Sequence, residues 1–282
     1  MTDTQYGFHD IAGRVAVITG GGGVLCGAFA EALAGVGAKI ALLDIDGAAA
    51  VASAKAVSDV SGAKVIGIAC DVLDRNALER ASDQIKGELG PIEILVNGAG
   101  GNAISATTDI EQLSDLSRIS SSFYGLEIDG FNQVFNLNFI GTLLPTQVLS
   151  RHMAEQGSGV IINISSMAAY HPLSKIPAYS AAKAAVSNLT EWLSVHLAPV
   201  GIRVNAIAPG FFLTEQLKFL AYDDKGDLTP RYERVIEKTA MKRLGRPGEL
   251  QGTLLYLASD TSSFVTGVVI PVDGGFNVNP AI

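Results

Sequence analysis

Features that would mark other classes of protein are scarce in this sequence. Its 282 residues include only two cysteines, Cys26 and Cys70, which stand far apart with no CxxC or Cys/His grouping. A disulfide framework needs paired cysteines, and a zinc site needs closely spaced ligands. The sequence therefore predicts two buried, reduced thiols and no metal site.

Positive charge is also scarce. Lys and Arg number 20 against 28 Asp and Glu, so the formal net charge is −8 and the pI is about 5.0. Proteins that bind nucleic acid gather Lys and Arg into clusters that meet the phosphates. We therefore expect no nucleic-acid partner, and any anionic ligand has to be held by a few placed groups.

Long apolar runs are missing. The first ten residues lack the basic stretch and the apolar stretch of an export signal, and no apolar run approaches the ~20 residues that span a bilayer. We therefore expect a cytoplasmic protein with no membrane partner.

Apolar residues are nevertheless abundant, at 48% of the chain, and they fall in short runs separated by longer helical patterns. Alanine-rich stretches at 28–36 and 181–197 have the spacing of amphipathic helices. This alternation predicts an α/β fold: a single Rossmann-type, doubly wound parallel sheet of about seven strands with helices on both faces, in one domain over residues 1–282. The predicted strands are 14–18, 39–43, 64–69, 92–96, 160–164, 202–206 and 268–272.

Two segments, 102–129 and 210–247, interrupt this alternation. The first is polar and rich in Ser and Thr, and the second contains an acidic turn followed by a predicted helix at 230–238. Loops beyond the carboxyl ends of parallel strands form the ligand crevice in folds of this kind. We expect both segments to contact the substrate.

A glycine turn follows the first predicted strand and opens a helix near Val24. Glycine lets the backbone approach a pyrophosphate, and the start of a helix offers unpaired N–H groups and a positive dipole end. Asp44, at the end of the second strand, can accept hydrogen bonds from both adenosine ribose hydroxyls and would repel a 2′-phosphate. NAD is therefore the expected cofactor, in preference to NADP. Capping of the helix that begins near Gly47 is the alternative role for Asp44, and Asp71 could likewise meet the adenine amine or form a turn.

Tyr179 and Lys183 stand four residues apart, so they share one face of a predicted helix, and Ser166 lies 13 residues before Tyr179 at the end of the fifth strand. Hydride addition to a ketone places negative charge on oxygen, and a phenol can deliver the proton that neutralises it. A neighbouring ammonium favours phenolate, so we expect Lys183 to lower the pKa of Tyr179 from its usual value of about 10. We expect Ser166 to hold the carbonyl oxygen.

Taken together, these motifs resemble those of the short-chain dehydrogenases/reductases from about residue 14 to 276. The matching stretches are TGGGG, NGAG, NFIG, NISS, YSAAK, APGFFLT, GRPGEL and VTGVVIPVDGG. The resemblance implies a catalytic tetrad of Asn138, Ser166, Tyr179 and Lys183, with Asn138 positioning a water that relays protons to Lys183. It also implies a homotetramer, built in part from the long helices before and after Tyr179.

The same resemblance extends the cofactor site. It places Asn97 beside the cofactor, and Phe212 and Thr214 against the carboxamide. Besides Tyr179 and Lys183, the residues expected to contact NAD are Gly20, Gly22, Gly23, Val24, Leu25, Asp44, Ile45, Asp71, Val72, Asn97, Gly98, Ala99, Gly100, Pro209, Gly210, Phe212 and Thr214.

The glycine turn differs from that of most family members, and this difference points to a smaller group within the family. Most members of the family carry glycine where Val24 and Cys26 stand here, so the turn must be built differently. The stretches GGGGVLCGA, LNFIGTLLPTQV and PLSKIPAYSAAKAAVSN are similar to those of a subset, the D-mannonate oxidoreductases (fructuronate reductases). This likeness implies NADH-dependent reduction of a keto-hexuronate such as fructuronate.

Other functions stay open at this point. A polyol, gluconate or other sugar dehydrogenase would use the same tetrad with a different pocket. A catalytically silent NAD-binding regulator would be expected to lack the tyrosine or the lysine, and both are present. An acyl-carrier-protein reductase is disfavoured, because Asp44 suits NAD and no basic docking patch is evident.

An anionic sugar needs a cation near the catalytic tyrosine. Lys175, four residues before Tyr179, is the first candidate, and the alternative is a lysine exposed on a surface loop. Arg243, Arg118 and His171 are the rivals. The predicted substrate contacts are Ser166, Met167, Lys175, Phe211 and Arg243.

Overall fold

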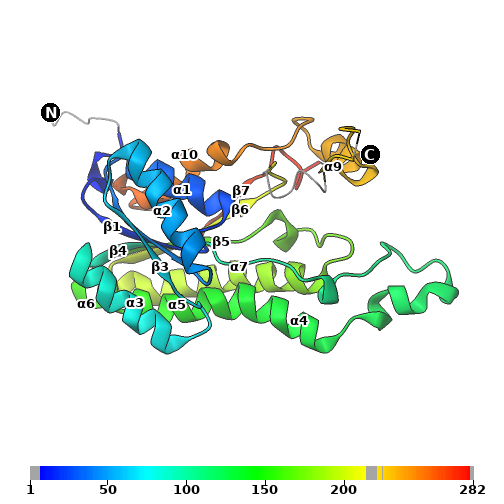
Figure 1. Ribbon diagram of the computed structural model, residues 1–282, viewed down its shortest axis with the longest axis horizontal. Helices are drawn as coiled ribbons and strands as arrows, with labels where there is room; N and C mark the ends of the chain where they lie inside the picture. The colour runs from blue at the N-terminus through cyan, green and yellow to red at the C-terminus, as the bar shows by residue number, and fades with distance from the viewer. Residues whose placement is uncertain (1–6, 214–220, 224, 280–282) are drawn as a thin grey trace.

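A seven-stranded parallel sheet forms the centre of the protein in a computed structural model, which describes residues 7–213, 221–223 and 225–279 (Figure 1). The strands lie in the order β3-β2-β1-β4-β5-β6-β7, and each neighbouring pair is parallel. This order confirms the predicted doubly wound sheet. The strands are β1 (Val15–Thr19), β2 (Lys39–Asp44), β3 (Val65–Ala69), β4 (Ile92–Asn97), β5 (Gly159–Ile164), β6 (Ile202–Pro209) and β7 (Val269–Val272).

Helices cover both faces of the sheet (Figure 1). On one face lies a first apolar core, to which the strands contribute residues such as Ile18 and Val96. The helices that cover this face contribute Phe29 and Leu254. On the other face, a second core joins residues such as Val17 to Leu78 and to helices later in the chain. The first face is covered by α1 (Val24–Gly35), α2 (Gly47–Ser61) and α10 (Gln251–Ala258), and the second by α3 (Arg75–Glu88), α5 (Gly141–Leu149), α6 (Arg151–Gln156) and α7 (Pro177–Leu197).

The two segments expected to contact substrate extend from the carboxyl edge of the sheet, at the right-hand end of Figure 1. The segment 102–129 forms an arm of short 3₁₀ turns that reaches past α4 (Ile128–Phe135). The second segment contains α9 (Pro230–Lys238), with the bounds that its pattern predicts. A π-helical turn, Asn136–Ile140, joins α4 to α5. The 3₁₀ turns are His9–Ile11, Ile104–Ala106, Leu116–Ser121, Phe123–Gly125, Met167–Ala169, Ala198–Val200, Pro247–Leu250 and Asp260–Ser262.

Helix ends and thiols agree with the sequence-based expectations. Gly37 and Gly201, which follow the ends of two helical stretches, have φ angles of +89° and +73°, a conformation that favours glycine. Cys26 and Cys70 are buried and unpaired. Within the described ranges, no helix is both long and apolar enough to cross a membrane.

Candidate active site

The glycine turn between β1 and α1 leaves no room for side chains. Gly20 has a φ angle of +70°, and a Cβ at this residue would lie 2.9 Å from the Cα of Ala99. A Cβ at Gly22 would lie 2.8 Å from the Cβ of Ala49. No side chain caps the first N–H groups of α1, which begins at Val24. These N–H groups and the positive end of the helix dipole are suited to an anion such as a pyrophosphate.

Asp44 ends β2 directly beside this turn. Its Oδ2 accepts a hydrogen bond from the Gly22 N–H at 3.0 Å, and its Oδ1 accepts one from the Asp46 N–H at 3.0 Å. Because a carboxylate accepts about four hydrogen bonds, both oxygens keep capacity for hydroxyl donors. The helix-capping alternative for Asp44 is wrong, because Asp46 caps α2 by accepting from the Ala49 N–H at 3.0 Å.

Val24 and Cys26, the two departures from the usual glycines, have different roles. Val24 begins α1, whereas Cys26 is buried within its first turn. The Cys26 thiol donates a weak hydrogen bond to the Thr19 carbonyl at 3.5 Å, and it occupies the space that a Cβ on Gly98 would need. Burial raises the pKa of Cys26 to about 12, and the nearby Asp44 adds to the shift. A neutral thiol therefore packs the helix against the turn after β4.

The residues after β2 and β3 lie at the same edge of the sheet. The side chain of Ile45 is exposed, and that of Val72 is buried. Asp71 Oδ1 accepts a hydrogen bond from the Leu73 N–H at 2.8 Å. This bond forms a turn, which was the alternative role for Asp71. In the described part of the chain, no three His, Cys, Asp or Glu side chains gather as a metal site requires.

The turn after β4 is tied to β1 by Thr19, a residue that no sequence motif singled out. The Gly98 and Ala99 N–H groups donate to the Thr19 hydroxyl at 3.1 and 3.2 Å. Gly100, in the same turn, lies next to two catalytic candidates. A Cβ on Gly100 would lie 2.6 Å from Asn138 Oδ1 and 3.2 Å from Lys183 Nζ.

Asn97 lies beside this turn with its side chain in the interior. Its Nδ2 donates to Thr146 Oγ1 at 2.9 Å and to Asn163 Oδ1 at 2.8 Å, and Asn163 in turn donates to Thr190 Oγ1 at 2.9 Å. Asn97 Oδ1 is buried and has no hydrogen-bond partner among the described residues. This chain of buried amides and hydroxyls joins β4 and β5 to α5 and α7, so the Asn97 side chain holds the end of the sheet in place.

Pro209 ends β6, and the next residues turn sharply toward β7. A Cβ on Gly210 would lie 2.6 Å from the Cα of Asp273, and the Gly210 N–H donates to the Val272 carbonyl at 2.9 Å. Phe212 is buried and pairs with Gly245. Thr214, predicted to meet the carboxamide, lies outside the described residues.

Tyr179 and Ser166 meet at the carboxyl end of β5. Ser166 is buried directly after this strand, and its hydroxyl accepts a hydrogen bond from the Ala168 N–H at 3.1 Å. Tyr179 lies in the first turn of α7, packed against a small apolar cluster that includes Ala106 and Val134, and the Ser166 hydroxyl is near enough to its own to lower the pKa of Tyr179. Two hydroxyls from different elements thus converge on one point.

Lys183 lies one helical turn after Tyr179, and its ammonium is buried. Its Nζ donates to the Ile164 carbonyl at 2.7 Å and lies 5.7 Å from the centroid of the Tyr179 ring. Asn138, in the π-helical turn, donates from Nδ2 to the Gly101 carbonyl at 2.7 Å, and its Oδ1 accepts from the Gly101 N–H at 3.2 Å. Asn138 and Lys183 therefore lie beside the segment Gly100–Gly101, and the Tyr179 ring lies next to Lys183.

The expected lowering of the Tyr179 pKa by Lys183 is wrong. Burial raises the pKa of Tyr179 above its usual value, and the hydrogen bond with Ser166 offsets this in part. Burial also lowers the pKa of Lys183 to about 8. Desolvation disfavours the charged form of both groups, so it outweighs the attraction between phenolate and ammonium on which the expectation rested.

Known proteins resemble this chain over nearly its whole length. A family model described as enoyl-(acyl carrier protein) reductase matches residues 25–277. The oxidoreductase UxuB of Bacillus subtilis, described as uncharacterized, is 47% identical over 269 residues, which are 95% of this chain and 96% of that protein. A crystal structure of a short-chain type dehydrogenase/reductase from Mycobacterium marinum is 33% identical with a TM-score of 0.80, covering 96% of this chain and 98% of that one.

This chain is a short-chain dehydrogenase/reductase. A further crystal structure, from Haemophilus influenza with bound NAD and provisionally named a D-mannonate oxidoreductase, is 45% identical with a TM-score of 0.91. The alignment covers 98% of this chain and 99% of that one. The family, the fold and the oxidoreductase class predicted from the motifs are confirmed.

The short-chain dehydrogenase/reductase places its candidate substrate residues in three different surroundings. Met167 is buried directly after Ser166, and Phe211 lies after β6 against the rings of Tyr232 and Phe276, at centroid distances of 6.5 and 5.2 Å. Lys175 has an unusual φ angle of +75° and lines a cavity together with the exposed rings of the 102–129 arm.

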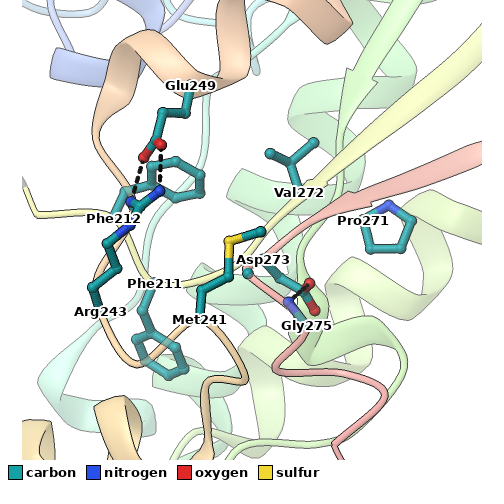
Figure 2. A pocket seen from close by; sticks show the side chains of 11 residues that line it. Phe211, Phe212, Met241, Arg243, Glu249, Pro271, Val272, Asp273 and Gly275 are labelled. Carbon is teal, nitrogen blue, oxygen red and sulfur yellow. Dashed lines mark hydrogen bonds and ion pairs between the residues drawn. The ribbon is translucent and has the colours of Figure 1, made fainter.

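Arg243 is already paired (Figure 2). Its guanidinium donates two hydrogen bonds to the Glu249 carboxylate, at 2.8 and 2.6 Å, beside a cavity of about 380 Å³ lined by Phe211 and Phe212. A bidentate pair of this kind occupies the donors that a substrate carboxylate would need. Arg118 lies on the exposed tip of the arm.

Proposed function

We propose that this short-chain dehydrogenase/reductase transfers hydride between NAD(H) and a carbonyl or hydroxyl carbon of an open-chain sugar acid, with Tyr179 as general acid and base. The observation that carries the proposal is the grouping of Ser166, Tyr179 and Lys183, with Lys183 beside Gly100, at the edge of the sheet where Asp44 and the glycine turn also lie. This edge includes the switch point between β1 and β4, where folds of this kind bind their ligands.

The residues at this edge fit an NAD dinucleotide. The uncapped first turn of α1 suits the pyrophosphate, and Asp44 retains lone pairs for the ribose hydroxyls while its charge opposes a 2′-phosphate. NADH, when bound, supplies the hydride. The neighbour that contains NAD shares this fold at a TM-score of 0.91.

The catalytic residues have protonation properties that suit reduction. The raised pKa keeps the Tyr179 hydroxyl protonated at neutral pH, so it can donate a proton to the oxygen as negative charge develops there. Ser166 can hold the same oxygen, because its hydroxyl accepts from the Ala168 N–H and keeps its own proton to donate. Lys183, with a pKa of about 8, exchanges protons near neutral pH, and Asn138 fixes the backbone beside it. In the oxidative direction, Tyr179 accepts the proton.

A sugar acid is the substrate class that the relatives favour, and fructuronate or mannonate is the proposed pair. The neighbour provisionally named a D-mannonate oxidoreductase supports this assignment. The segment 102–129 and the described part of 210–247 are the proposed pocket walls. They line the cavities through residues such as Thr108, Glu111 and Phe211.

We propose a cytoplasmic homotetramer of single-domain subunits. The exposed faces of the helices offer apolar surface for such contacts: Trp192 and Val195 of α7 are 58% and 79% exposed, and Phe264 is fully exposed. Light scattering after size-exclusion chromatography measures the assembly directly.

A carbonyl panel tests the reaction. NADH and NADPH are offered side by side with fructuronate, tagaturonate and 5-ketogluconate, and NAD is offered with polyols and gluconate, while nicotinamide absorbance is followed. We expect turnover with NADH and a keto-hexuronate. Turnover confined to polyols would replace the sugar-acid assignment, and tight NADH binding without any turnover would favour a silent regulator.

A further inference from the structure

A second cavity, of about 420 Å³, lies beside α9, and one face of this helix supplies it with cations. Arg231, Arg234 and Lys238 stand at positions i, i+3 and i+7, which fall on one side of a helix. All three line the cavity, opposite His171 and beside Phe211. In a chain with a net charge of −8, three cations around one cavity concentrate positive potential there.

One wall of this cavity is hydrogen-bonded to the residues that directly follow Ser166 and Tyr179. It is formed by the segment 171–174, between Ser166 and Tyr179 in the chain. The His171 N–H donates to the Met167 carbonyl at 3.3 Å, directly after Ser166, and the Leu173 N–H donates to Ser180 Oγ at 3.2 Å, directly after Tyr179. The segment 171–174 therefore lies between the cavity and the neighbours of both catalytic hydroxyls.

Two of the three cations are available to an anion. Arg234 is paired with Glu111 at 2.8 Å. Within the described part of the chain, the Arg231 guanidinium and the Lys238 ammonium have no hydrogen-bond or ion-pair partner, although Arg231 is partly buried. His171 Nε2 lies 3.1 Å from the Asn277 carbonyl at the rim. A partly buried guanidinium such as that of Arg231 is suited to a ligand carboxylate, and the exposed Lys238 ammonium adds positive charge beside it.

The other cations near the site are less suitable. Arg243 is held by Glu249 through two hydrogen bonds. Lys175 lines a different cavity, together with Phe123 and Tyr124 of the arm.

We infer that the cavity beside α9 binds the carboxylate of the sugar acid through Arg231 and Lys238, while the carbonyl end of the same molecule reaches Tyr179. The inference rests on the proposed function and names the residues that give it its substrate class. The carboxylate of fructuronate is separated from its ketone by several hydroxyl-bearing carbons, so one molecule can occupy both places. Glu111, held by Arg234, is left to accept hydrogen bonds from those hydroxyls.

The test compares fructuronate with D-fructose, which carries a hydroxymethyl group in place of the carboxylate. Arg231→Gln should raise the KM for fructuronate by roughly ten- to a hundredfold, as expected for loss of a charge-assisted contact, and leave kcat and the KM for fructose within about twofold. Lys238→Gln, at a more exposed position, should raise the fructuronate KM by about threefold to tenfold. Arg231→Lys should restore part of the loss.

Two controls separate the possible failures. Arg151→Gln removes an exposed arginine from α6 and should change neither KM. Titration of the NADH-loaded protein with D-mannonate measures the carboxylate site without turnover, and Arg231→Gln should weaken this binding by the same factor. The inference is overturned if Arg231→Gln and Lys238→Gln leave the affinity for mannonate unchanged. It is also overturned if they raise the KM for fructose as much as the KM for fructuronate. If the wild-type protein reduces no keto-hexuronate but binds mannonate through Arg231, the proposed function is overturned and the inferred carboxylate site is not.

Discussion

The cofactor region and the proposed substrate region of this protein are built in different ways. The cofactor region joins strand ends through short turns whose backbone is closely packed: a Cβ on Gly20 would lie 2.9 Å from Ala99, and Asp44 bonds to Gly22 at 3.0 Å. The substrate region consists of two long segments with exposed charged residues such as Arg234 and Lys238. Close packing restricts changes in the first region, whereas the second can exchange side chains without disturbing the sheet.

This difference separates two kinds of mutational effect. Substitutions in the cofactor region should alter folding and nucleotide affinity together, because the same backbone serves both. Substitutions in the substrate region should alter substrate choice at nearly constant stability. The catalytic residues lie where the two regions meet, so they provide the strongest test of the comparison.

The largest effect is expected at Tyr179, where both regions contribute. Tyr179→Phe removes the proton donor but keeps the ring against Ala106 and Val134, so kcat should fall by at least about a hundredfold with unchanged NADH affinity. Steady-state kinetics and a nucleotide titration measure the two quantities. Tyr170→Phe is the matched control, since the Tyr170 hydroxyl donates to the Val269 carbonyl at 2.9 Å, away from Ser166. A wild-type rate in Tyr179→Phe would contradict the proposed chemistry.

Lys183 should make stability depend on pH in the protein without nucleotide. Its pKa is about 8 against an ordinary value of 10.5, so the unfolded chain binds more protons between these values and stability rises with pH across this window. Between pH 8 and pH 10 the free energy of unfolding of the wild type should rise by about 2 kcal/mol relative to Lys183→Met. Chemical denaturation of both proteins at the two pH values measures this, and parallel changes would mean that the folded ammonium is not destabilised by burial.

Asp44 tests the cofactor region alone. Asp44→Asn keeps an acceptor beside Gly22 but removes the charge, so the ratio of kcat/KM for NADPH over NADH should rise by roughly tenfold, equivalent to ~1.4 kcal/mol. Asp46→Asn is the matched control, because it changes a neighbouring carboxylate whose role is to cap α2. The same rise in Asp46→Asn, or a wild type that already prefers NADPH, would count against the role given to Asp44.

The smallest effect is expected at Cys26. Cys26→Ala removes a buried sulfur that packs against Gly98, so the free energy of unfolding should fall by about 1 kcal/mol. NADH affinity should change little, because the thiol, with its pKa raised to about 12, remains neutral and buried. Denaturation curves and nucleotide titration measure both. A tenfold loss of NADH affinity at unchanged stability would show that the thiol serves the nucleotide instead of the packing.

Local patterns in the sequence were sufficient for most of the fold. All seven strands were found from short apolar runs, and α9 was found with its bounds because Pro230 marks its start and its polar and apolar residues alternate at helical spacing. β6 was predicted too short: it continues to Pro209 because Ile207 pairs with Ile270 of β7, a contact that only the assembled sheet provides.

The functional site, like the fold, was predicted only in part. The spacing of Tyr179 and Lys183 on one helix, the glycine turn and the acidic end of β2 are properties of neighbouring residues, so the sequence revealed them. It could not show that Thr19 ties β1 to the turn after β4, or that Cys26 fills the space beside Gly98. It also overestimated the influence of Lys183 on Tyr179, because burial of both groups depends on the packed structure.

By itself, the sequence determined the alternation of strands and helices, the position of the anion-binding turn and the helical face that carries the tyrosine and lysine. These follow from periodicity, from glycine and from spacing within one element. Tertiary packing determines which of the described cations are already paired: Arg243 bonds to Glu249, whereas Arg231 of α9 lines a cavity that His171 also lines. Such partnerships join segments distant in the chain, and only packing determines which charges are neutralised by the protein and which remain for a ligand.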